Sequence, residues 1–190
     1  NTVYYRTAAL DGKVVFSGEK AIPNIRRADF GPLLDQMRSA FPTIKAIGFG
    51  LPGVMVNRQL CSDYSELNGS GFLDYFQEKY GLPAIFENDV NAACLGYCTR
   101  MQIDVSETVL YLYFPQKYIP GTAIFIDGKI HKGFCNYAGE IREHTFDIPW
   151  TDPEFQNNPP LFCEKIAGFI TGICAILSPG QVILSGSLIH

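Results

Sequence analysis

The sequence predicts an α/β protein with a mixed sheet. Strand-like apolar runs alternate with helix-like segments through much of the 190 residues, an order typical of a sheet flanked by helices. Two Asp-Gly pairs, Asp11-Gly12 and Asp127-Gly128, each lie between strand-like runs and predict tight hairpins. Hairpins add antiparallel pairs, so the sheet should be mixed. A composition of 47% hydrophobic and 18% charged residues is typical of a globular chain of one or two domains.

The first part of the chain predicts five elements. Residues 1–20 read as two strands of a hairpin. Residues 28–41 carry apolar side chains at helical spacing, and Pro42 ends that helix. Residues 44–56 are a short apolar strand that runs into a Gly-Pro turn. Residues 72–81 form a helix whose last residue, a glycine, is a typical C-terminal stop.

The middle of the chain continues the alternation. A buried strand over 82–86 is followed by a helix over 89–101. Residues 108–114 are a second buried strand, and 121–133 are the second hairpin. This order of strand, helix and strand favours an open sheet covered by helices.

The last part predicts four segments. Residues 136–146 read as a loop followed by a strand, and 150–160 are polar, contain prolines and read as irregular. A long helix is predicted over 161–179, and a strand over 181–187. The longest apolar run, 166–177, is shorter than a membrane span and is expected to be a buried helix.

Charge and cysteine content restrict the function classes. The net charge is −4 and the pI about 5.3, without the clustered Lys and Arg of a nucleic-acid interface. None of the six cysteines lies in a Cys-x-x-Cys pair, and Cys94 and Cys98 are four apart on a predicted helix, where core packing is favoured over a metal pair. We therefore expect a reduced, cytoplasmic protein with no targeting sequence and no membrane segment.

Four loops follow apolar strands, where ligands bind in open α/β sheets: 50–53, 87–91, 115–122 and 185–187. The stretch "IFENDVNAACLGY" places Asn88 and Asp89 between a strand and a helix, with further polar side chains on both sides. One helix cap needs only one of them. Asp89 is therefore a candidate base or ligand for a hydroxyl group, held ionised by the helix dipole. The alternative is an ordinary N-cap.

Two other patterns leave alternatives open. "GFGLPG" (48–53) lacks the spacing of a dinucleotide or phosphate loop, so it is either a tight turn or a backbone that approaches a ligand closely. "YAGEIREH" (137–144) combines Glu140, Glu143 and His144 and is either a surface strand or part of a polar site. The residues after His144 supply no cluster of metal ligands.

Seven segments in order and at matching spacing resemble the ROK family of repressors, uncharacterised open reading frames and sugar kinases. They are "DGKVV", "IGFGLPGVMVN", "LDYFQEKYGLPAIFENDVNAACLGY", "TVLYLYF", "GTAIFIDGKIHKG", "NYAGEI" and "ILSPGQVILSGSL". The resemblance implies an actin-like ATPase (ribonuclease H-like) fold with mixed sheets flanked by helices. It further implies two lobes, 1–103 and 104–190, truncated at both ends relative to the family.

The resemblance also implies roles for individual residues. Asn88 and Asp89 match the sugar-binding pair, whose aspartate is the catalytic base in the kinases. Glu140 matches the glutamate that hydrogen-bonds sugar hydroxyls, and Gly53 matches the turn that lies against the sugar. Further sugar contacts are expected from Asn68, Glu143 and His144. Contacts to a cofactor are expected from Gly121, Thr122 and Gly186.

Departures from the family pattern concern phosphate and zinc. Where the kinases have a Gly-Thr-Gly phosphate loop, this chain reads "FPQKYIPGTA" (114–123), with two prolines that lack N–H groups and with bulky side chains. The glycine cluster after the last strand is reduced to "SGS" (185–187). Arg142 and Glu143 stand where the family's zinc module begins. We therefore expect no zinc and no bound cofactor, and Mg-ATP only if the protein is a kinase.

Three functions remain open on the sequence. The first is a sugar-binding effector domain of a transcriptional regulator, which would contact DNA only through a region outside this chain. The second is an ATP-dependent hexose or N-acetylhexosamine kinase with Asp89 as base. The third is a dimerisation module that has lost sugar binding. The expected partners are a hexose or N-acetylhexosamine and a second copy of the chain in a homodimer.

Overall fold

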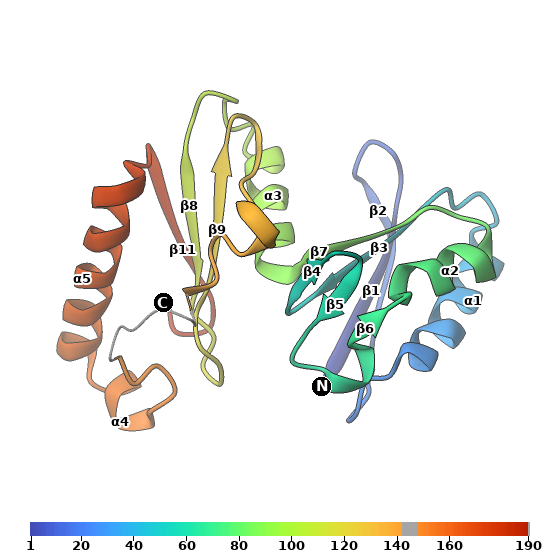
Figure 1. Cartoon of the computed structure of the whole chain (residues 1–190), viewed down its shortest axis with the longest axis horizontal. Helices are drawn as coiled ribbons and strands as arrows, with labels where there is room; N and C mark the ends of the chain where they lie inside the picture. The colour runs from blue at the N-terminus through green and yellow to red at the C-terminus, as the bar shows by residue number, and fades with distance from the viewer. Residues whose placement is uncertain (142–147, 190) are drawn as a thin grey trace. The chain divides into compact units, whose positions relative to one another are not determined.

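A computed structural model describes residues 1–141 and 148–189, and packing divides the chain into two compact units, Asn1–Glu87 and Asn88–His190 (Figure 1). The lobes expected at 1–103 and 104–190 stay a prediction, because a division by packing does not test a division by function.

The first unit contains three small sheets. Strands β1 (Thr2–Ala8) and β2 (Val14–Ala21) form the predicted hairpin, and the Lys13 N–H donates to Asp11 Oδ1 in its turn. Strand β3 (Ile47–Leu51) pairs with β7 (Ala84–Asn88). The third sheet was not predicted and comprises β4 (Val54–Val56), β5 (Gln59–Cys61) and β6 (Gly69–Ser70). Its strands are two or three residues long, too short for an alternating pattern to show in the sequence.

Helices α1 (Phe30–Ala40) and α2 (Phe72–Tyr80) close the first unit around an aromatic core. Phe30 packs edge-on against Phe49 with ring centroids 5.5 Å apart, and Phe49 lies 4.7 Å from Phe76. Helix α2 ends as predicted at Gly81, which has a φ of 62° and donates its N–H to the Gln77 carbonyl.

The second unit is built on one four-stranded sheet in the order β10-β9-β8-β11. Its strands are β8 (Val109–Tyr113), β9 (Gly121–Ile126), β10 (Lys129–Ile130) and β11 (Gln181–Ser185). β11 runs parallel to β8, whereas β9 is antiparallel to both β8 and β10. This sheet is therefore mixed, as predicted. Asp127 and Gly128 both have positive φ and form the second predicted hairpin turn.

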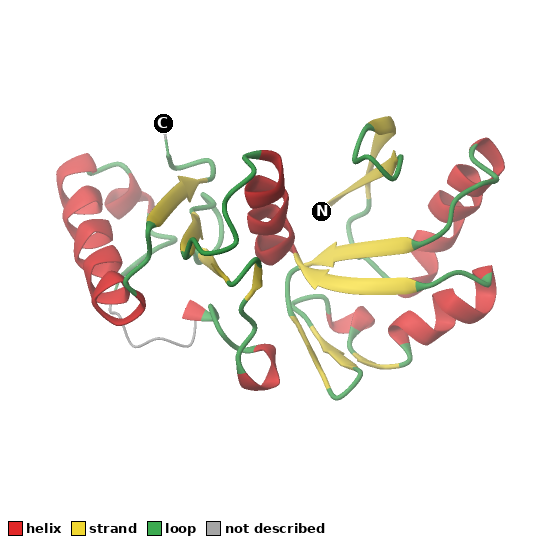
Figure 2. Cartoon of the chain, turned by 90° about the horizontal axis from the view of Figure 1, so that it is seen from above, coloured by secondary structure: helices red, strands yellow, loops and turns green. Residues whose placement is uncertain are grey.

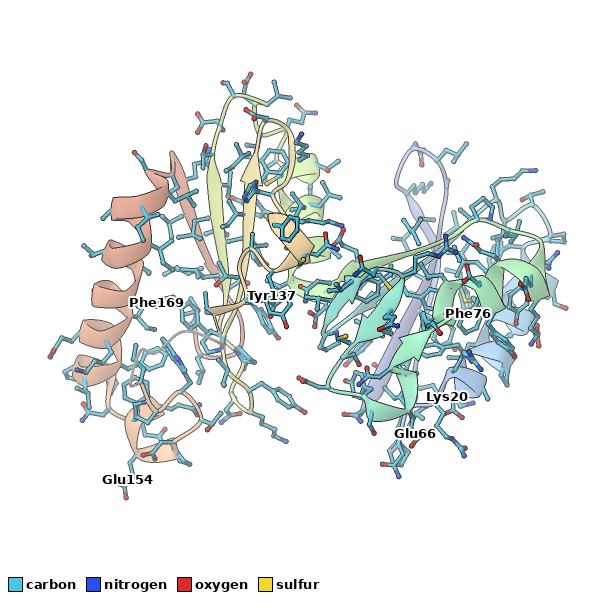
Figure 3. The ribbon with its side chains drawn as sticks, viewed as in Figure 1. Lys20, Glu66, Phe76, Tyr137, Glu154 and Phe169 are labelled. Carbon is cyan, nitrogen blue, oxygen red and sulfur yellow. The ribbon has the colours of Figure 1, made fainter. Side chains whose placement is uncertain are left out.

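Strand β8 has apolar side chains on both faces because a helix covers each face. Helix α3 (Asp89–Arg100) packs Cys94 and Cys98 on the face that carries Val109. Helix α5 (Pro159–Leu177) packs on the face that carries Leu110, and Phe169 points from it toward the strands (Figure 3). Figure 2 shows the two helices on opposite sides of these strands. The continuous apolar run of the sequence is the signature of this arrangement.

Helix α5 corrects one prediction, since it is not a buried helix. Phe162, Ile166 and Phe169 are its buried residues, spaced as one stripe, whereas Ile176 is 91% exposed. It packs on a single sheet face, so only one stripe of an apolar sequence is covered. At 19 residues it is also the one helix of the described chain that is long and apolar enough to cross a membrane, by length and composition alone.

The segment between β10 and α5 also differs from prediction. Residues 150–160, expected to be irregular, contain the short helix α4 (Pro153–Gln156), capped by the Asp152 side chain. The 3₁₀ turns η1 (Arg27–Asp29), η2 (Ser65–Leu67) and η3 (Phe134–Asn136) complete the described elements. Most of the strand expected within 136–146 falls on residues 142–147, outside the described residues.

Candidate functional site

Asn88 and Asp89 lie at the N-terminus of α3, as the sequence predicts. The Asn88 side-chain oxygen accepts hydrogen bonds from the N–H groups of Val90 (2.9 Å) and Asn91 (3.1 Å), so Asn88 is the helix cap. Asp89 is the first helical residue, is exposed, and accepts from the Val90 N–H through Oδ1 at 2.9 Å. The exposed carboxylate thus stands at the positive end of the helix dipole, where an anion is stabilised.

Glycine contacts connect this helix end to the start of β9 and to the turn before Glu140. A Cβ at Gly121 would lie 2.5 Å from a methyl group of Val90, so β9 begins against the first turn of α3. A Cβ at Gly139, which has a φ of 93°, would lie 2.6 Å from the Thr122 carbonyl oxygen. Only glycine allows this close approach with this backbone conformation. The turn carrying Glu140 is therefore held directly on β9.

Glu140 is half-buried, and its N–H donates to the Tyr137 carbonyl at 3.2 Å. Thr122, on β9 beside Gly121, is 7% exposed. Its hydroxyl has no hydrogen-bond partner among the described residues, which is unusual for a buried polar group. Five of the predicted site residues, Asn88, Asp89, Gly121, Thr122 and Glu140, thus belong to one run of packed segments in the second unit.

In the first unit, Gly53 and Asn68 meet at Ser62. A Cβ at Gly53, at a φ of 131°, would lie 2.7 Å from Ser62 Cα. The Asn68 side chain accepts from the Ser62 N–H at 2.6 Å and donates to the Ser62 carbonyl at 3.0 Å. Asn68 therefore closes the loop between β5 and β6, and Gly53 lies against the same loop. No sequence pattern indicated a role for Ser62. A sugar contact by Asn68 or Gly53 stays a prediction.

The turn that follows β8 is closed by the turn that follows β11. The Phe114 N–H donates to the Ser185 carbonyl at 2.8 Å, and the Gln116 N–H donates to Ser187 Oγ at 2.9 Å. Gly186 packs on the backbone of Phe114. From the neighbouring helix α4, Gln156 donates to the Gln116 carbonyl at 2.8 Å. No sequence pattern indicated these partners, which come from segments about 40 and 70 residues away.

These contacts bear on whether the turn fits nucleotide phosphates. Backbone cradling of phosphates needs several free N–H groups in succession. Here Pro115 and Pro120 have none, and those of Phe114 and Gln116 are already donated within the protein. Four positions of this turn, Phe114, Pro115, Gln116 and Pro120, therefore offer no N–H group to a phosphate.

Metal and thiol chemistry have little support in the described residues. No group of three or more His, Cys, Asp or Glu side chains within 1–141 and 148–189 is placed to hold a metal ion. Glu143 and His144 lie outside the described residues. Cys94 and Cys98 pack in the core as predicted, and burial, with the neighbouring Cys98, raises the pKa of the Cys94 thiol to about 12. Such a thiol is neutral and unreactive near pH 7.

Comparison with known families settles the lineage of the chain. The family model of the ROK family matches residues 22–147, more than half of the chain. The chain belongs to the ROK family. The resemblance read from the seven segments is thereby confirmed. No curated protein matches this ROK chain at a significant level.

Solved structures give the same fold. A ROK family protein from Streptococcus pneumoniae TIGR4, in complex with sucrose, has a TM-score of 0.77 at 18% identity, over 98% of this chain and 77% of the other. The ROK hexokinase from Thermus thermophilus has a TM-score of 0.74 at 16% identity, over 93% and 75%. A ROK family transcriptional regulator, a homologue of the E. coli MLC protein, has a TM-score of 0.57 at 20% identity, over 73% and 37%. The actin-like fold expected for the chain is therefore confirmed.

Proposed function

We propose that this ROK chain is a sugar-binding effector domain of a transcriptional regulator, whose DNA-binding part lies outside these residues. The observation that carries the proposal is the closed turn after β8. Its Gln116 N–H is bound to Ser187 Oγ, while Asp89 stands exposed at the start of α3. A protein that senses a sugar needs an exposed carboxylate such as that of Asp89, but it does not need an open phosphate loop.

The sugar would be a hexose or N-acetylhexosamine held by Asn88, Asp89 and Glu140. A sugar hydroxyl both donates and accepts hydrogen bonds, so carboxylate and amide side chains suit it. Relatives of the same fold include a complex with sucrose and a hexokinase, which supports a sugar ligand. The regulator among them supports the sensing role.

Sensing would follow from a shift in conformational population. A sugar that binds one conformation more tightly than another favours that conformation by its differential affinity. The geometry presented to DNA would change accordingly. The proposal also includes a cytoplasmic location and a homodimer, both expected from the family.

The alternative is an ATP-dependent sugar kinase. The retention of Asp89 at a strand end favours it, because a positioned carboxylate can accept the proton of a sugar hydroxyl. The prolines and occupied N–H groups at 114–120 oppose it. No phosphoryl-transfer step is assigned to these residues.

Titration calorimetry with hexoses and N-acetylhexosamines, with and without Mg-ATP, tests the proposal. We expect one sugar to bind, binding to be lost in Asp89→Ala, and Mg-ATP to give no heat. Glu164→Ala removes an exposed acid from α5 and should leave the affinity unchanged. Phosphorylation of any sugar would overturn the regulator, and the absence of binding by any sugar would favour a dimerisation module.

A further inference from the structure

Two aromatic side chains project from the turn that precedes Glu140. Phe134 is 95% exposed, and among the described residues it is the only phenylalanine in the exposed class. Tyr137, three residues before Glu140, is 51% exposed and lies on the side of its unit away from α5 (Figure 3). Scattered exposed apolar residues are ordinary, but here two exposed aromatic residues lie three positions apart on the short turn that leads to Glu140.

The turn presents these rings from a closed backbone. The Ala138 N–H donates to the Lys132 carbonyl at 3.0 Å, and a Cβ at Gly133 would lie 3.0 Å from Ala138 Cβ. The two ends of the turn are therefore in contact. Gly139 fixes the turn on β9, and the hydrogen bond between the Glu140 N–H and the Tyr137 carbonyl ties the rings to the candidate sugar contact.

The chemistry of sugars indicates what such a surface would bind. A sugar ring has hydroxyl groups around its rim and C–H groups on its faces. Carboxylates and amides satisfy the hydroxyls, whereas an aromatic ring removes the C–H face, or an apolar group linked to the sugar, from water. The turn with the exposed rings leads to Glu140, and close contacts of Gly139 on Thr122 and of Gly121 on Val90 connect it to the first turn of α3, so one unit offers both kinds of contact.

We infer that the turn 133–137 is a second subsite, which takes the next ring of a hexose glycoside. The hexose itself is held by Asn88, Asp89 and Glu140, so the inference rests on the proposed function. Phe134 and Tyr137 pack against the ring attached to the anomeric oxygen. The preferred ligand is accordingly a glycoside, either a disaccharide or an aryl glycoside, and not a free hexose.

Calorimetry with glucose and N-acetylglucosamine, each compared with its phenyl glycoside, tests this subsite. One phenyl glycoside should bind about 3- to 10-fold more tightly than its free sugar, the range expected for one aromatic contact. Phe134→Ala should abolish that preference and change the affinity for the free sugar by less than about twofold, because the polar contacts are untouched. Phe134→Trp should retain the preference.

Tyr118→Ala is the matched control, since Tyr118 is an aromatic residue of the same unit that is 64% exposed on another loop. It should leave the preference for the glycoside intact. If the free sugar binds and Phe134→Ala preserves the preference, or if neither glycoside is preferred, the subsite is wrong and the proposed function stands. If neither sugar nor glycoside binds, the proposed function fails and the subsite with it.

Discussion

The N-terminus of α3 and the turn after β8 both follow a strand, but their polar groups are used differently. At α3, side chains cap the helix, and the Asp89 carboxylate stays exposed. After β8, the N–H groups of Phe114 and Gln116 are donated to Ser185 and Ser187. One unit therefore presents a carboxylate suited to hydroxyl groups at one strand end and uses two backbone N–H groups internally at the other. Two strand ends of one unit therefore differ, since one leaves a carboxylate exposed and the other uses its backbone groups for internal packing.

The largest effect is expected at the closed turn. Gly186→Ala places a Cβ on the Phe114 backbone at a φ of 114° and should lower the free energy of unfolding by about 2–3 kcal/mol. Urea unfolding measures the change. Gly168→Ala on α5 has open space around its Cβ and should stabilise the protein by about 0.5–1 kcal/mol. Equal effects from the two substitutions would show that the turn is not tightly closed.

The next effect concerns the cap of α3. Asn88→Ala removes the acceptor for two N–H groups and should cost about 1 kcal/mol of stability together with sugar affinity. Asn88→Asp keeps a side-chain oxygen that can cap the helix. A loss of sugar affinity in that variant therefore cannot result from a loss of stability. Asn158→Ala removes the cap of α5 and should reduce stability without reducing affinity. If Asn88→Asp is stable and its sugar affinity is undiminished, the Asn88 side chain caps the helix and its amide group is not needed to bind sugar.

A smaller effect is expected at Ser187. Ser187→Ala removes the acceptor of the Gln116 N–H and should cost about 0.5–1.5 kcal/mol, measured by urea unfolding. Calorimetry with Mg-ATP should still show no binding, because Pro115 and Pro120 continue to lack N–H groups. The appearance of nucleotide binding would mean that the turn is a phosphate site blocked by one hydrogen bond.

The smallest effect at neutral pH concerns α3 itself. The pKa of Cys94 is about 12 in the fold and 9.0 ordinarily, so the unfolded chain loses this proton first as the pH rises. The thiol's contribution to stability is complete below about pH 9 and is lost as the pH approaches about 12. Urea midpoints at about pH 8 and about pH 10.5 should therefore differ less in Cys94→Ala than in the parent chain. Cys163 is exposed, so Cys163→Ala should show the same change of urea midpoint with pH as the parent chain. If Cys94→Ala shows that same change as well, the effect does not come from the Cys94 thiol.

The family, the order of the long elements and both Asp-Gly hairpins could be predicted from the sequence. These features depend on local backbone chemistry and on the period of apolar residues, which a few neighbouring positions encode. The sequence also placed Asn88 and Asp89 at a strand end before a helix. For the same reason it could not show the sheet of β4, β5 and β6, whose strands are too short to carry a period.

The assembly of the candidate site depends on long-range packing. The closure of Gln116 by Ser187 and Gln156 joins segments far apart in sequence, and no local pattern encodes such partners. The one-sided burial of α5 likewise depends on which sheet face it meets and not on its composition. Local chemistry therefore placed Asp89 at the start of a helix, whereas long-range packing determined that the N–H groups of Phe114 and Gln116 are donated within the protein.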